Sequence, residues 1–518
     1  MTEPDSLLTP LCQFIDSGQL EEAETYVAEL SAGEAPPAEF WIRAGKIFKD
    51  SPRPVLALKT YNQGLKLYPR YLPIYMELAD YFIENKEYEQ AERSLLIAND
   101  LIPNNGMIEG KLGQNFLKSG NYEACIRWTT SAIQHQPDVP DLYNILGDAH
   151  LRLGQLDEAR MILEKGLSLA PDFPRLLNTL ASVFALEGDY IRSNEILDRA
   201  LALEPEFAQA HVKHSVNLLT MGKLQSGWAE YEYRRALPAI RNPDQGCPEW
   251  QGEGIAGKTI LIWTEQGLGD TIQYFRYLYR MKALGVKIIL ECRPVLYPLF
   301  EGHPVLDSIL LRNGERPPID LHCSIMSLPK YFERNFDDRR IHVPYLDPRE
   351  DTGPQLKEFI QKLDSSNCFK VGLTWAGNPD NKNDANRSIP VQLLARLLDL
   401  RSIQFVNLQF DRQGTSADID ELPDPTPLIH NFAETAAVLK HLDLVISVDT
   451  SMCHLAGALG RPVWTLLPWN PDFRWGLDTE ETDYYPTMRL FRQPTRNDWD
   501  SVLNRVTGQL NALAKGGK

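Results

Sequence analysis

The stretch Asp443–Pro468, DLVISVDTSMCHLAGALGRPVWTLLP, carries the pattern that decides the expected fold of the second half of the chain. It opens with a short apolar, β-branched run, Leu444–Val448, which predicts a buried strand. A compact Ala-rich helix is expected over Cys453–Leu459, and Gly460 can end it in a left-handed conformation. Because a proline then bars further helix, the apolar run Val463–Leu467 predicts the next strand.

Three polar residues, Asp449, Thr450 and Ser451, join the first of these strands to the helix and can cap the helix N-terminus. A strand, a tight polar turn and a helix N-terminus together form a place where backbone N–H groups face a bound anion. The helix dipole contributes only about 0.3–1 kcal/mol per charge. We therefore expect cationic side chains from elsewhere in the chain to complete an anion site.

Length, charge and cysteine content bound the kind of protein. A chain of 518 residues is too long for one hydrophobic core, so about two to four domains are expected. The net charge of −17 argues against nucleic acid or an anionic membrane surface as the main partner. No signal peptide and no apolar run of about 20 residues is visible, and the seven cysteines are scattered without a Cys-x-x-Cys pair. These features predict a cytoplasmic protein with reduced thiols and no membrane span.

Four residue series repeat every 34 positions in the first half of the chain. They are Pro69, Pro103, Pro137, Pro171 and Pro205; Gly18, Pro52, Lys86, Gly120, Gly154, Gly188 and Gly222; Gly45, Ala79, Gly113, Gly147, Ala181 and Ser215; and Ala23, Ala57, Ala91, Cys125, Ala159, Ser193 and Gly227. This period and these markers resemble the tetratricopeptide repeat, a hairpin of two helices. In such a hairpin the glycine opens the turn, the small residues let the helices approach, and the proline ends the second helix.

One hairpin cannot bury its apolar face alone, so residues 1–240 are expected to stack about six of them into an α-solenoid. The resemblance implies a concave groove that holds peptide or protein segments. The alternative is a scaffold or oligomerisation arm. The last repeat departs from the pattern with Trp228, Tyr231 and Tyr233, which we interpret as the seam where the array docks on the second half. Residues 241–257, rich in proline and glycine, are expected to be a linker.

The second half predicts two α/β lobes, residues 258–346 and 368–518, joined by a linker over 347–367. Further strands are expected at Thr259–Thr264, Val286–Glu291, Ser308–Leu311, Leu321–Ser324, Lys370–Trp375 and Ile403–Leu408, and helices at Thr271–Leu284 and Val391–Leu400. Strands that alternate with helices predict parallel sheets. This arrangement resembles the GT-B fold of glycosyltransferases, with its two Rossmann-like lobes. The resemblance implies that the last helix, Trp499–Ala514, crosses back to brace the first lobe.

The motif Asp449-Thr450-Ser451-x-x-His454 resembles the nucleotide-diphosphate signature of heptosyltransferase-like, family 9 glycosyltransferases. The resemblance implies that the Asp-Thr pair and the histidine hold a nucleotide. The family pattern usually has glycine where this chain has Ser451. The alternative is structural, with Asp449 capping the helix and His454 packed in the core.

A polar loop after the strand Lys370–Trp375 provides the second group of candidate residues. We assign Trp375, Asn378, Lys382, Arg387 and, after the next strand, Gln409 to the nucleotide site. Mobile cations on this loop would stabilise the negative charge that a departing nucleotide diphosphate develops. The alternative is a solvated loop.

Metal-dependent transferases use an Asp-x-Asp motif instead of such cations, and Asp498-Trp499-Asp500 matches it. That segment lies where a helix cap is expected, so we predict neither a metal nor another cofactor. The nucleotide sugar then enters as a substrate.

The turn Gly267-Leu268-Gly269-Asp270 is the third candidate element, since its glycines allow a substrate close to the backbone. In the family that the chain resembles, an aspartate in this turn is proposed as the base that deprotonates the acceptor hydroxyl, so we take Asp270 as the catalytic residue and Gly269 as part of the binding site. Asp270 lies in the first lobe, where we expect it to be away from the nucleotide. The alternatives are a plain helix cap, or a dinucleotide-binding turn served by Glu291, which leaves the second lobe unexplained.

Together these features resemble bacterial proteins that join tetratricopeptide repeats to a family-9-like glycosyltransferase domain, some of which modify proteins, including flagellin. We expect an inverting, metal-independent glycosyltransferase whose protein acceptor is recruited by the repeats. A second hypothesis replaces the protein acceptor with a saccharide or lipid-linked glycan. A third makes the chain a non-catalytic repeat scaffold with a degenerate transferase domain.

Overall fold

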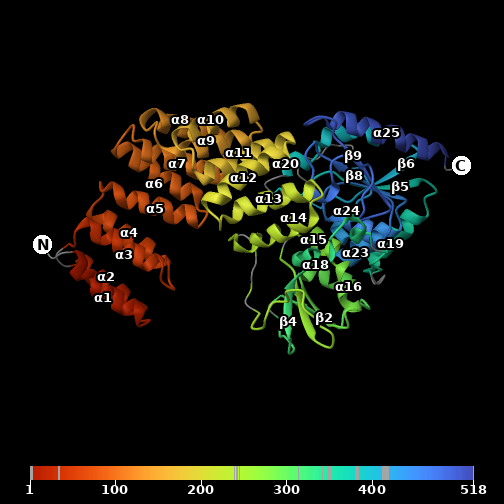
Figure 1. Cartoon of the computed structure of the whole chain (residues 1–518), viewed down its shortest axis with the longest axis horizontal. Coiled ribbons are helices and arrows are strands. Elements are labelled where there is room, and N and C mark those ends of the chain that lie inside the picture. The colour runs from red at the N-terminus through yellow and green to blue at the C-terminus, as the bar shows by residue number, and fades with distance from the viewer. Residues whose placement is uncertain are drawn as a thin grey trace. The chain divides into compact units, whose positions relative to one another are not determined.

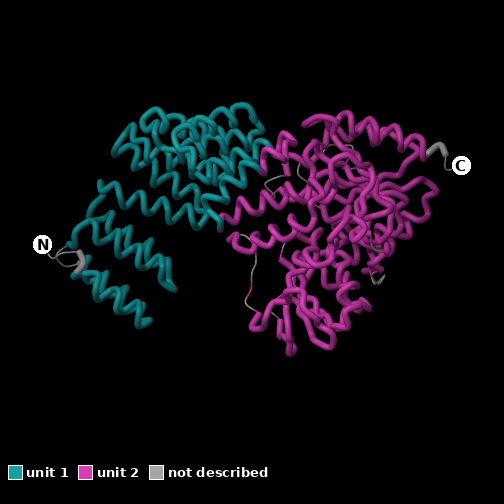
Figure 2. The backbone as a smooth tube through the Cα atoms, viewed as in Figure 1, with its two compact units in different colours: residues 1–184, 195–205 teal, residues 185–194, 206–518 magenta. Residues whose placement is uncertain are grey.

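A computed structural model describes residues 4–32, 35–238, 240, 243, 245–265, 267–312, 314–340, 342–347, 352–379, 384–410, 419 and 421–516. By its internal contacts the chain divides into two compact units (Figure 2). The first holds residues 1–184 and 195–205, and the second holds residues 185–194 and 206–518. Compact packing units need not follow functional domains, so the five predicted segments stay predictions.

Helices that pack as successive hairpins make up the first unit (Figure 1). They are α1 (Pro4–Asp16), α2 (Leu20–Ala32), α3 (Ala38–Lys49), α4 (Val55–Leu67), α5 (Leu72–Glu84), α6 (Tyr88–Leu101), α7 (Gly106–Ser119), α8 (Tyr122–His135), α9 (Pro140–Arg152), α10 (Leu156–Leu169), α11 (Pro174–Glu187) and α12 (Tyr190–Leu203). The turn between α11 and α12 belongs to the second unit. The predicted helical repeats are confirmed.

The repeat markers have the roles that their spacing predicts. The turn residues Gly120, Gly154 and Gly188 have φ values of 84°, 75° and 87°, a left-handed conformation that glycine adopts without strain. A Cβ on Gly113 would lie 2.1 Å from Oγ1 of Thr129, so only glycine lets α7 and α8 approach this closely. The prolines of the first series stand two residues beyond the ends of α4, α6, α8, α10 and α12.

The second unit begins with its own helical hairpin, α13 (Ala208–Thr220) and α14 (Leu224–Tyr231), followed by a short 3-10 turn, η1 (Glu232–Ala236). Trp228 of this hairpin is buried and packs edge-on against Tyr274 and Phe473, with ring centroids 5.9 and 5.6 Å apart. Its indole N–H donates to Glu333 at 3.0 Å. Trp228 and Tyr231 therefore belong to the core of the second unit, whereas Tyr233 is partly exposed and stacks on His211.

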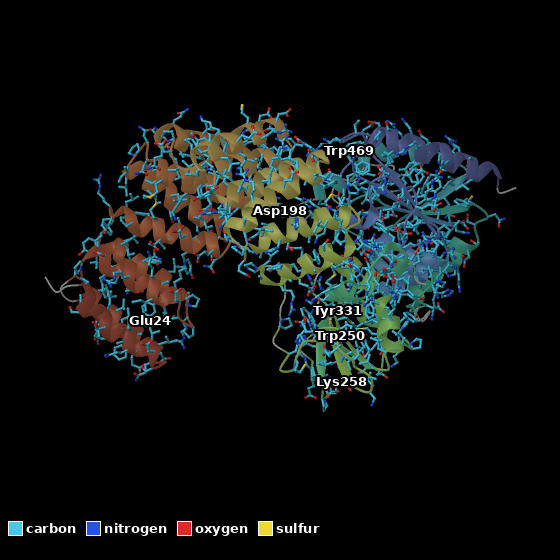
Figure 3. All side chains as sticks on the ribbon, viewed as in Figure 1. Glu24, Asp198, Trp250, Lys258, Tyr331 and Trp469 are labelled. Carbon is cyan, nitrogen blue, oxygen red and sulfur yellow. The ribbon has the colours of Figure 1, made fainter. Side chains whose placement is uncertain are left out.

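The first lobe is a four-stranded parallel sheet in the order β3-β2-β1-β4. Its strands are β1 (Thr259–Trp263), β2 (Lys287–Cys292), β3 (Ser308–Leu311) and β4 (Leu321–Ser324), and its helices are α15 (Leu268–Tyr274), α16 (Tyr277–Ala283), α17 (Tyr297–Phe300) and α18 (Leu328–Phe332). The chain from residue 245 to β1 packs against this lobe, where Trp250 lies 4.4 Å from the ring of Tyr331 (Figure 3). Helix α19 (Pro354–Asp364) leads to the second lobe.

The second lobe is a five-stranded parallel sheet in the order β6-β5-β7-β8-β9. Its strands are β5 (Phe369–Thr374), β6 (Ile403–Asn407), β7 (Leu444–Val448), β8 (Val463–Leu467) and β9 (Met488–Arg492). Its helical segments are α20 (Asp384–Arg387), η5 (Val391–Leu394), α21 (Ala395–Leu398), α23 (Phe432–Lys440), α24 (Ser451–Ala458), η7 (Phe473–Trp475) and α25 (Trp499–Gly516). The predicted fold class, a helical repeat array followed by two parallel α/β lobes, is confirmed.

The prediction that the last helix braces the first lobe is wrong. The buried face of α25, from Trp499 to Leu510, belongs to the core of the second lobe, where it meets Leu397 and Phe491 (Figure 1). The apolar residues of α25 pack into the core of the second lobe, which removes them from water. The segment from Phe473 to Tyr485, which precedes β9, makes the connection to the first lobe instead.

Two predicted helices also differ in detail. The expected helix Thr271–Leu284 is divided into α15 and α16, although Phe275 and Arg276 between them keep helical backbone torsions. The expected helix Val391–Leu400 is a 3-10 turn followed by one α-helical turn. Among the described residues, no helix combines the length and apolar composition needed to cross a membrane.

Candidate functional site

Both sheets reverse their strand order at one point, and the predicted motifs follow the strands at these points. In the first lobe the reversal separates β1 from β4, and in the second it separates β5 from β7. Open parallel sheets bind ligands outside the carboxyl ends of the strands at such a reversal. The Gly267–Asp270 turn follows β1, the polar loop follows β5 and the Asp449 motif follows β7.

The first turns of α15 and α24 touch each other across the two lobes. A Cβ on Gly269 would lie 2.8 Å from Cδ2 of His454 and 3.2 Å from Cα of Ser451. Contacts below about 3.0 Å force something to move, so glycine is the residue that lets the lobes meet here. This contact joins the Gly267–Asp270 turn and the Asp449–His454 motif into one candidate site.

Thr450, rather than Asp449, caps α24. Its hydroxyl oxygen accepts from the N–H of Met452 at 3.3 Å and lies 3.1 Å from Oγ of Ser447. Ser451 is the first helical residue and is partly exposed. The alternative in which Asp449 caps this helix is therefore excluded. The carboxylate of Asp449 instead lies near Nε2 of His454.

His454 lies inside the site with only 3% of its side chain exposed. Its Nδ1 lies 3.0 Å from the hydroxyl of Tyr485, its ring stacks on Trp475, and its Nε2 lies 3.8 Å from Oδ1 of Asp449. Burial, and then the positive charges of Arg474 and Arg276, lower the pKa of His454 well below its usual range. The imidazole is therefore neutral near pH 7.

Asp449 is a largely buried carboxylate, 14% exposed. Burial and the neighbouring charge of Asp472 raise its pKa to about 6, although Arg474 and Arg387 act in the opposite direction. Near neutral pH this carboxyl is close to its titration point, which is unusual for an aspartate. Strongly shifted, buried titratable groups are typical of functional sites.

Two predicted site residues hold the loop after β5 in place. The side-chain oxygen of Gln409 accepts from the N–H groups of Trp375 and Ala376, at 3.2 and 2.9 Å. Trp375 and Gln409 are both buried, so they position the loop rather than face solvent. Asn378 is exposed further along the same loop, and Lys382 lies outside the described residues.

Arg387 is fixed rather than mobile, which corrects the expectation of a flexible cationic loop. Its Nε pairs with Oδ1 of Asp384 at 3.0 Å, and its Nη1 donates to the main-chain oxygen of Asp449 at 2.8 Å. Asp384 and Arg387 are three residues apart on the short helix α20, where such a pair meets readily. The loop after β5 is thereby tied to the motif after β7.

The segment after β8 extends this side of the site. Trp469 is 46% exposed there (Figure 3), and Asn470 follows it. Oδ1 of Asn470 accepts from the hydroxyl of Tyr190 at 2.7 Å, and its main-chain oxygen accepts from the side chain of Asn386 at 3.5 Å. The start of α12 is thus linked to α20, which carries Arg387.

Asp270 is not away from the nucleotide motif, as its place in the first lobe led us to expect. Its Oδ2 accepts from the N–H of Gly267 at 2.9 Å, which caps α15, and its Oδ1 accepts from Nη2 of Arg474 at 2.7 Å. Arg474 belongs to η7 in the second lobe, so the ion pair spans the lobes. Asp270 caps its helix and also faces the nucleotide side.

Arg474 is a candidate site residue that the sequence analysis missed. Only 10% of its side chain is exposed, and Asp472 lies 3.4 Å from its Nε. Burial alone would lower the pKa of Arg474, but the charges of Asp472, Asp270 and Asp449 outweigh burial and hold it well above its usual range. One signal could have found it, because the segment Asp472–Arg474 follows β8, the neighbour of β7, at the same edge of the sheet.

The acceptor-side turn is anchored by a buried ion pair. The carboxylate of Glu265, just before the turn, accepts hydrogen bonds from Nε and Nη2 of Arg234 at 3.2 and 2.6 Å. Both side chains are almost completely buried. Arg234 belongs to η1, directly after the last helical hairpin. The end of the repeat region therefore holds the turn that carries Asp270.

A second buried network connects the lobes behind the site. Arg276 of the first lobe donates to the main-chain oxygen of Tyr484 at 2.8 Å and lies over the rings of Tyr345, Tyr484 and Tyr485. Glu333 accepts from the hydroxyl of Tyr484 at 3.0 Å, from Arg339, and from the Trp228 indole noted above. These contacts fix the segment that carries Arg474.

One cluster of described residues has the spacing of a metal site. Side-chain atoms of Asp449, Cys453 and His454 lie within 4.8 Å of one another. However, the thiol of Cys453 donates to the main-chain oxygen of Thr450 at 3.0 Å, and burial raises its pKa far above the usual value. The three side chains are thus engaged with one another and with the protein. The absence of a metal from the mechanism stays a prediction.

A cavity of about 310 Å³ lies elsewhere in the second unit, between α16 and the chain before α19. Tyr279, His303 and Tyr345 line it, and its lining includes none of the predicted site residues. The chemistry-bearing groups gather instead at the contact between α15 and α24. The structure thus joins Gly269, Asp270, Trp375, Arg387 and Gln409 with the Asp449–His454 motif.

Comparison with known proteins supports both halves of this architecture. Residues 430–477 match the model of glycosyltransferase family 9 (heptosyltransferase), and residues 116–183 match a tetratricopeptide repeat model. The first match spans β7, α24, β8 and η7, and so contains both Asp449 and Arg474.

A curated relative extends this similarity. Protein FlbA of Caulobacter vibrioides is 28% identical over 331 residues, which cover 57% of this chain and 54% of FlbA. The chain therefore spans about half the length of the curated relative that it matches.

Similar solved structures are repeat proteins. TTC0263 of Thermus thermophilus is 20% identical with a TM-score of 0.30 and covers 32% of this chain and 92% of its own. A tetratricopeptide repeat protein of Parabacteroides merdae is 17% identical with a TM-score of 0.38 and covers 45% and 93%. Scores this low carry no argument about function.

Proposed function

We propose that the protein is a glycosyltransferase that moves a sugar from a nucleotide-sugar donor to a hydroxyl of a protein acceptor. The observation that carries the proposal is the Gly269 contact, which brings Asp270 of one lobe and the Asp449–His454 motif of the other to a single guanidinium, Arg474. The family 9 match over this motif supports a sugar donor carried on a nucleotide.

The residues present fit the parts of an inverting transfer. Asp270 takes the proton of the acceptor hydroxyl, and the hydroxyl oxygen forms a bond to the anomeric carbon. The bond from that carbon to the donor phosphate breaks, and its electron pair leaves with the nucleoside diphosphate. Arg474, Arg387 and the N-terminus of α24 offset the charge that develops on this leaving group. A metal ion is not required in this scheme.

Neutral His454 suits the donor side of the site. Its low pKa keeps it uncharged, so one ring nitrogen donates and the other accepts. If the hydroxyl of Tyr485 donates to Nδ1, Nε2 carries the hydrogen and points toward Asp449. A nucleotide bound here would meet the Nε2–H group of a histidine whose charge does not change near pH 7.

The repeats are the proposed acceptor-binding element. A single serine or threonine side chain offers little contact area, and stacked helical hairpins provide a second surface for selection. A saccharide acceptor is the second candidate, and it is favoured by the match to glycosyltransferase family 9 (heptosyltransferase) alone. A non-catalytic scaffold is less compatible with a buried carboxylate of pKa about 6 at the interlobe contact.

A thermal-shift screen of nucleotide sugars, carried out in a chelator, tests donor binding. A ligand at about 100 times its dissociation constant adds about 2.7 kcal/mol to the free energy of unfolding. We expect one nucleotide family to raise the melting temperature, and Arg387→Gln to reduce that shift. Arg396→Gln is the matched control, because Arg396 pairs with Asp500 on the surface of the same lobe. No shift with any nucleotide sugar would contradict the proposal.

A further inference from the structure

Arg474 is shared among three carboxylates from two lobes. Its Nη2 lies 2.7 Å from Asp270 of the first lobe, its Nε lies 3.4 Å from Asp472, and Asp449 is within electrostatic reach. Two of these partners belong to its own lobe, and one does not. The pair with Asp270 is therefore the contact that can change without unfolding either lobe.

Asp270 has both carboxylate oxygens engaged in this arrangement. Oδ2 accepts from the N–H of Gly267, and Oδ1 accepts from Arg474. The bond to Gly267 caps α15 and is local, whereas the bond to Arg474 occupies the oxygen on the interlobe side. A charge-assisted bond of this kind is stronger than a neutral one, so it opposes the use of Oδ1 as a base.

Among the described residues, two guanidinium groups lie in a position to serve a diphosphate, and they differ in how they are held. Among the described residues discussed above, four carboxylates, those of Asp270, Asp384, Asp449 and Asp472, face the guanidinium groups of Arg387 and Arg474. Arg387 is held by Asp384 on its own helix and by a main-chain oxygen. A diphosphate at the N-terminus of α24 can therefore face both groups, but only the pair of Arg474 with Asp270 spans the lobes and can be exchanged for it.

We propose that Asp270 and the donor diphosphate compete for Arg474, so that donor binding takes the guanidinium and leaves Asp270 to act on the acceptor hydroxyl. This inference rests on the proposed function. Arg474 then exchanges Asp270 for the donor diphosphate, so Asp270 becomes free to act as a base only after the donor has bound. Acceptor activation then follows donor binding, and water is not activated by Asp270 before it.

Calorimetry with nucleoside diphosphates tests the competition directly. UDP, GDP, CDP, ADP and dTDP are titrated in a chelator into the full-length protein, and the tightest of them is used for the variants. Asp270→Asn keeps the shape and the cap but removes the charge, so we expect this diphosphate to bind at least about fivefold tighter. The matched control is Asp338→Asn, because Asp338 also caps a helical turn and pairs with an arginine, Arg280, away from the site. It should leave the affinity within about twofold.

A second variant and a second ligand make the result specific. Arg474→Gln should weaken diphosphate binding at least about tenfold, and adding Asp270→Asn to it should restore nothing. The parent nucleoside, which has no phosphate, should bind Asp270→Asn and the unchanged protein equally. If Arg474→Gln does not fold, the comparison of Asp270→Asn with Asp338→Asn still decides the question.

Three results would overturn the inference. Equal diphosphate affinity of Asp270→Asn and the unchanged protein would show that Asp270 does not compete for Arg474, while the proposed function would stand. An equal gain for the nucleoside would show that the substitution merely opens the site. Failure of every nucleoside diphosphate to bind the unchanged protein would remove the proposed function and the inference together.

Discussion

Asp449 illustrates how one residue of the site is set by its surroundings. Burial and Asp472 raise its pKa to about 6, whereas an aspartate in an unfolded chain titrates near about 3.9. Between these values the folded protein binds the proton more tightly, so stability falls as the pH rises, and the full cost is present above about pH 6. The buried carboxylate is thus kept at a cost in stability, as expected of a functional group.

Asp449→Asn should therefore stabilise the protein at alkaline pH and have little effect in acid. We expect a gain of the order of 1–3 kcal/mol near about pH 8, shrinking toward zero as the pH falls to about 4. Urea unfolding of both proteins at about pH 8 and about pH 5 measures it. The pKa of His454 is lowered, so its own contribution to stability falls as the pH drops, which is opposite to the trend expected from Asp449. A gain that grows on acidification would contradict the assignment.

Gly269 tests the contact between the lobes. A Cβ there would overlap His454 and approach the backbone of Ser451, so Gly269→Ala should cost about 1–3 kcal/mol and weaken nucleotide binding. Gly254→Ala is the control, because a Cβ on Gly254 meets nothing within 4 Å. Thermal unfolding and calorimetry measure both effects. Equal behaviour of the two variants would show that the contact is not needed.

At the scale of elements, the turn that carries Asp270 depends on a buried ion pair formed with the end of the repeat region. Arg234 and Glu265 are 1% and 0% exposed. Removing one partner of such a pair leaves an uncompensated buried charge, which costs about 3–5 kcal/mol, whereas an exposed pair contributes about 0–1 kcal/mol. The turn should be sensitive to Arg234 although this residue is not one of the predicted site residues.

Arg234→Leu should accordingly lower the free energy of unfolding by about 3–5 kcal/mol, and Glu265→Leu added to it should recover much of the loss. Arg396→Leu, at a surface pair of the same unit, should cost no more than about 1 kcal/mol. Chemical unfolding of the unchanged protein, of Arg234→Leu, Glu265→Leu and their double variant, and of Arg396→Leu gives the comparison. Additive losses in the double variant would show that the two side chains do not depend on each other.

The elements also show what local pattern could and could not predict. Strands β3, β4, β7 and β8 have the predicted bounds. Strands β7 and β8 are buried along their whole length, as an apolar run between turn residues predicts for a central parallel strand. Strand β9 was missed, since Met488–Arg492 is short and contains two arginines. The partner of α25 was wrong because an apolar helix face does not identify the surface that covers it. The pair of Arg474 with Asp270 joins residues 204 positions apart, which no local pattern can show.

At the scale of the whole molecule, the last helical hairpin belongs to the same packing unit as the two lobes. Truncation should reveal this dependence. A chain that begins at Ala185 keeps Trp228 and Arg234, whereas a chain that begins at Asn242 loses both and leaves Glu265 buried without its cation. We expect the longer chain to melt cooperatively and the shorter one to be unstable or aggregated. Equal melting temperatures by circular dichroism would contradict this view.

The repeats of the first unit should matter for the acceptor and not for the donor. The chain that begins at Ala185 should bind a nucleoside diphosphate as tightly as the full chain but transfer sugar poorly to a protein. In the full chain, tethering by the repeats would raise the local concentration of the acceptor to about the millimolar range. Calorimetry and mass spectrometry of the acceptor, with donor hydrolysis as the control, measure both. Equal transfer by both chains would favour a saccharide acceptor.

The most direct test of the central claim is sugar transfer itself, measured in a chelator as nucleoside diphosphate release and acceptor mass gain. The full-length protein is incubated with the donor found by thermal shift and with candidate acceptors, flagellin among them. We predict transfer by the unchanged protein and by Asp338→Asn, and a loss of about 10²–10⁴ in rate with Asp270→Asn. Full activity of Asp270→Asn, or transfer that appears only when a divalent metal is supplied, would contradict the account.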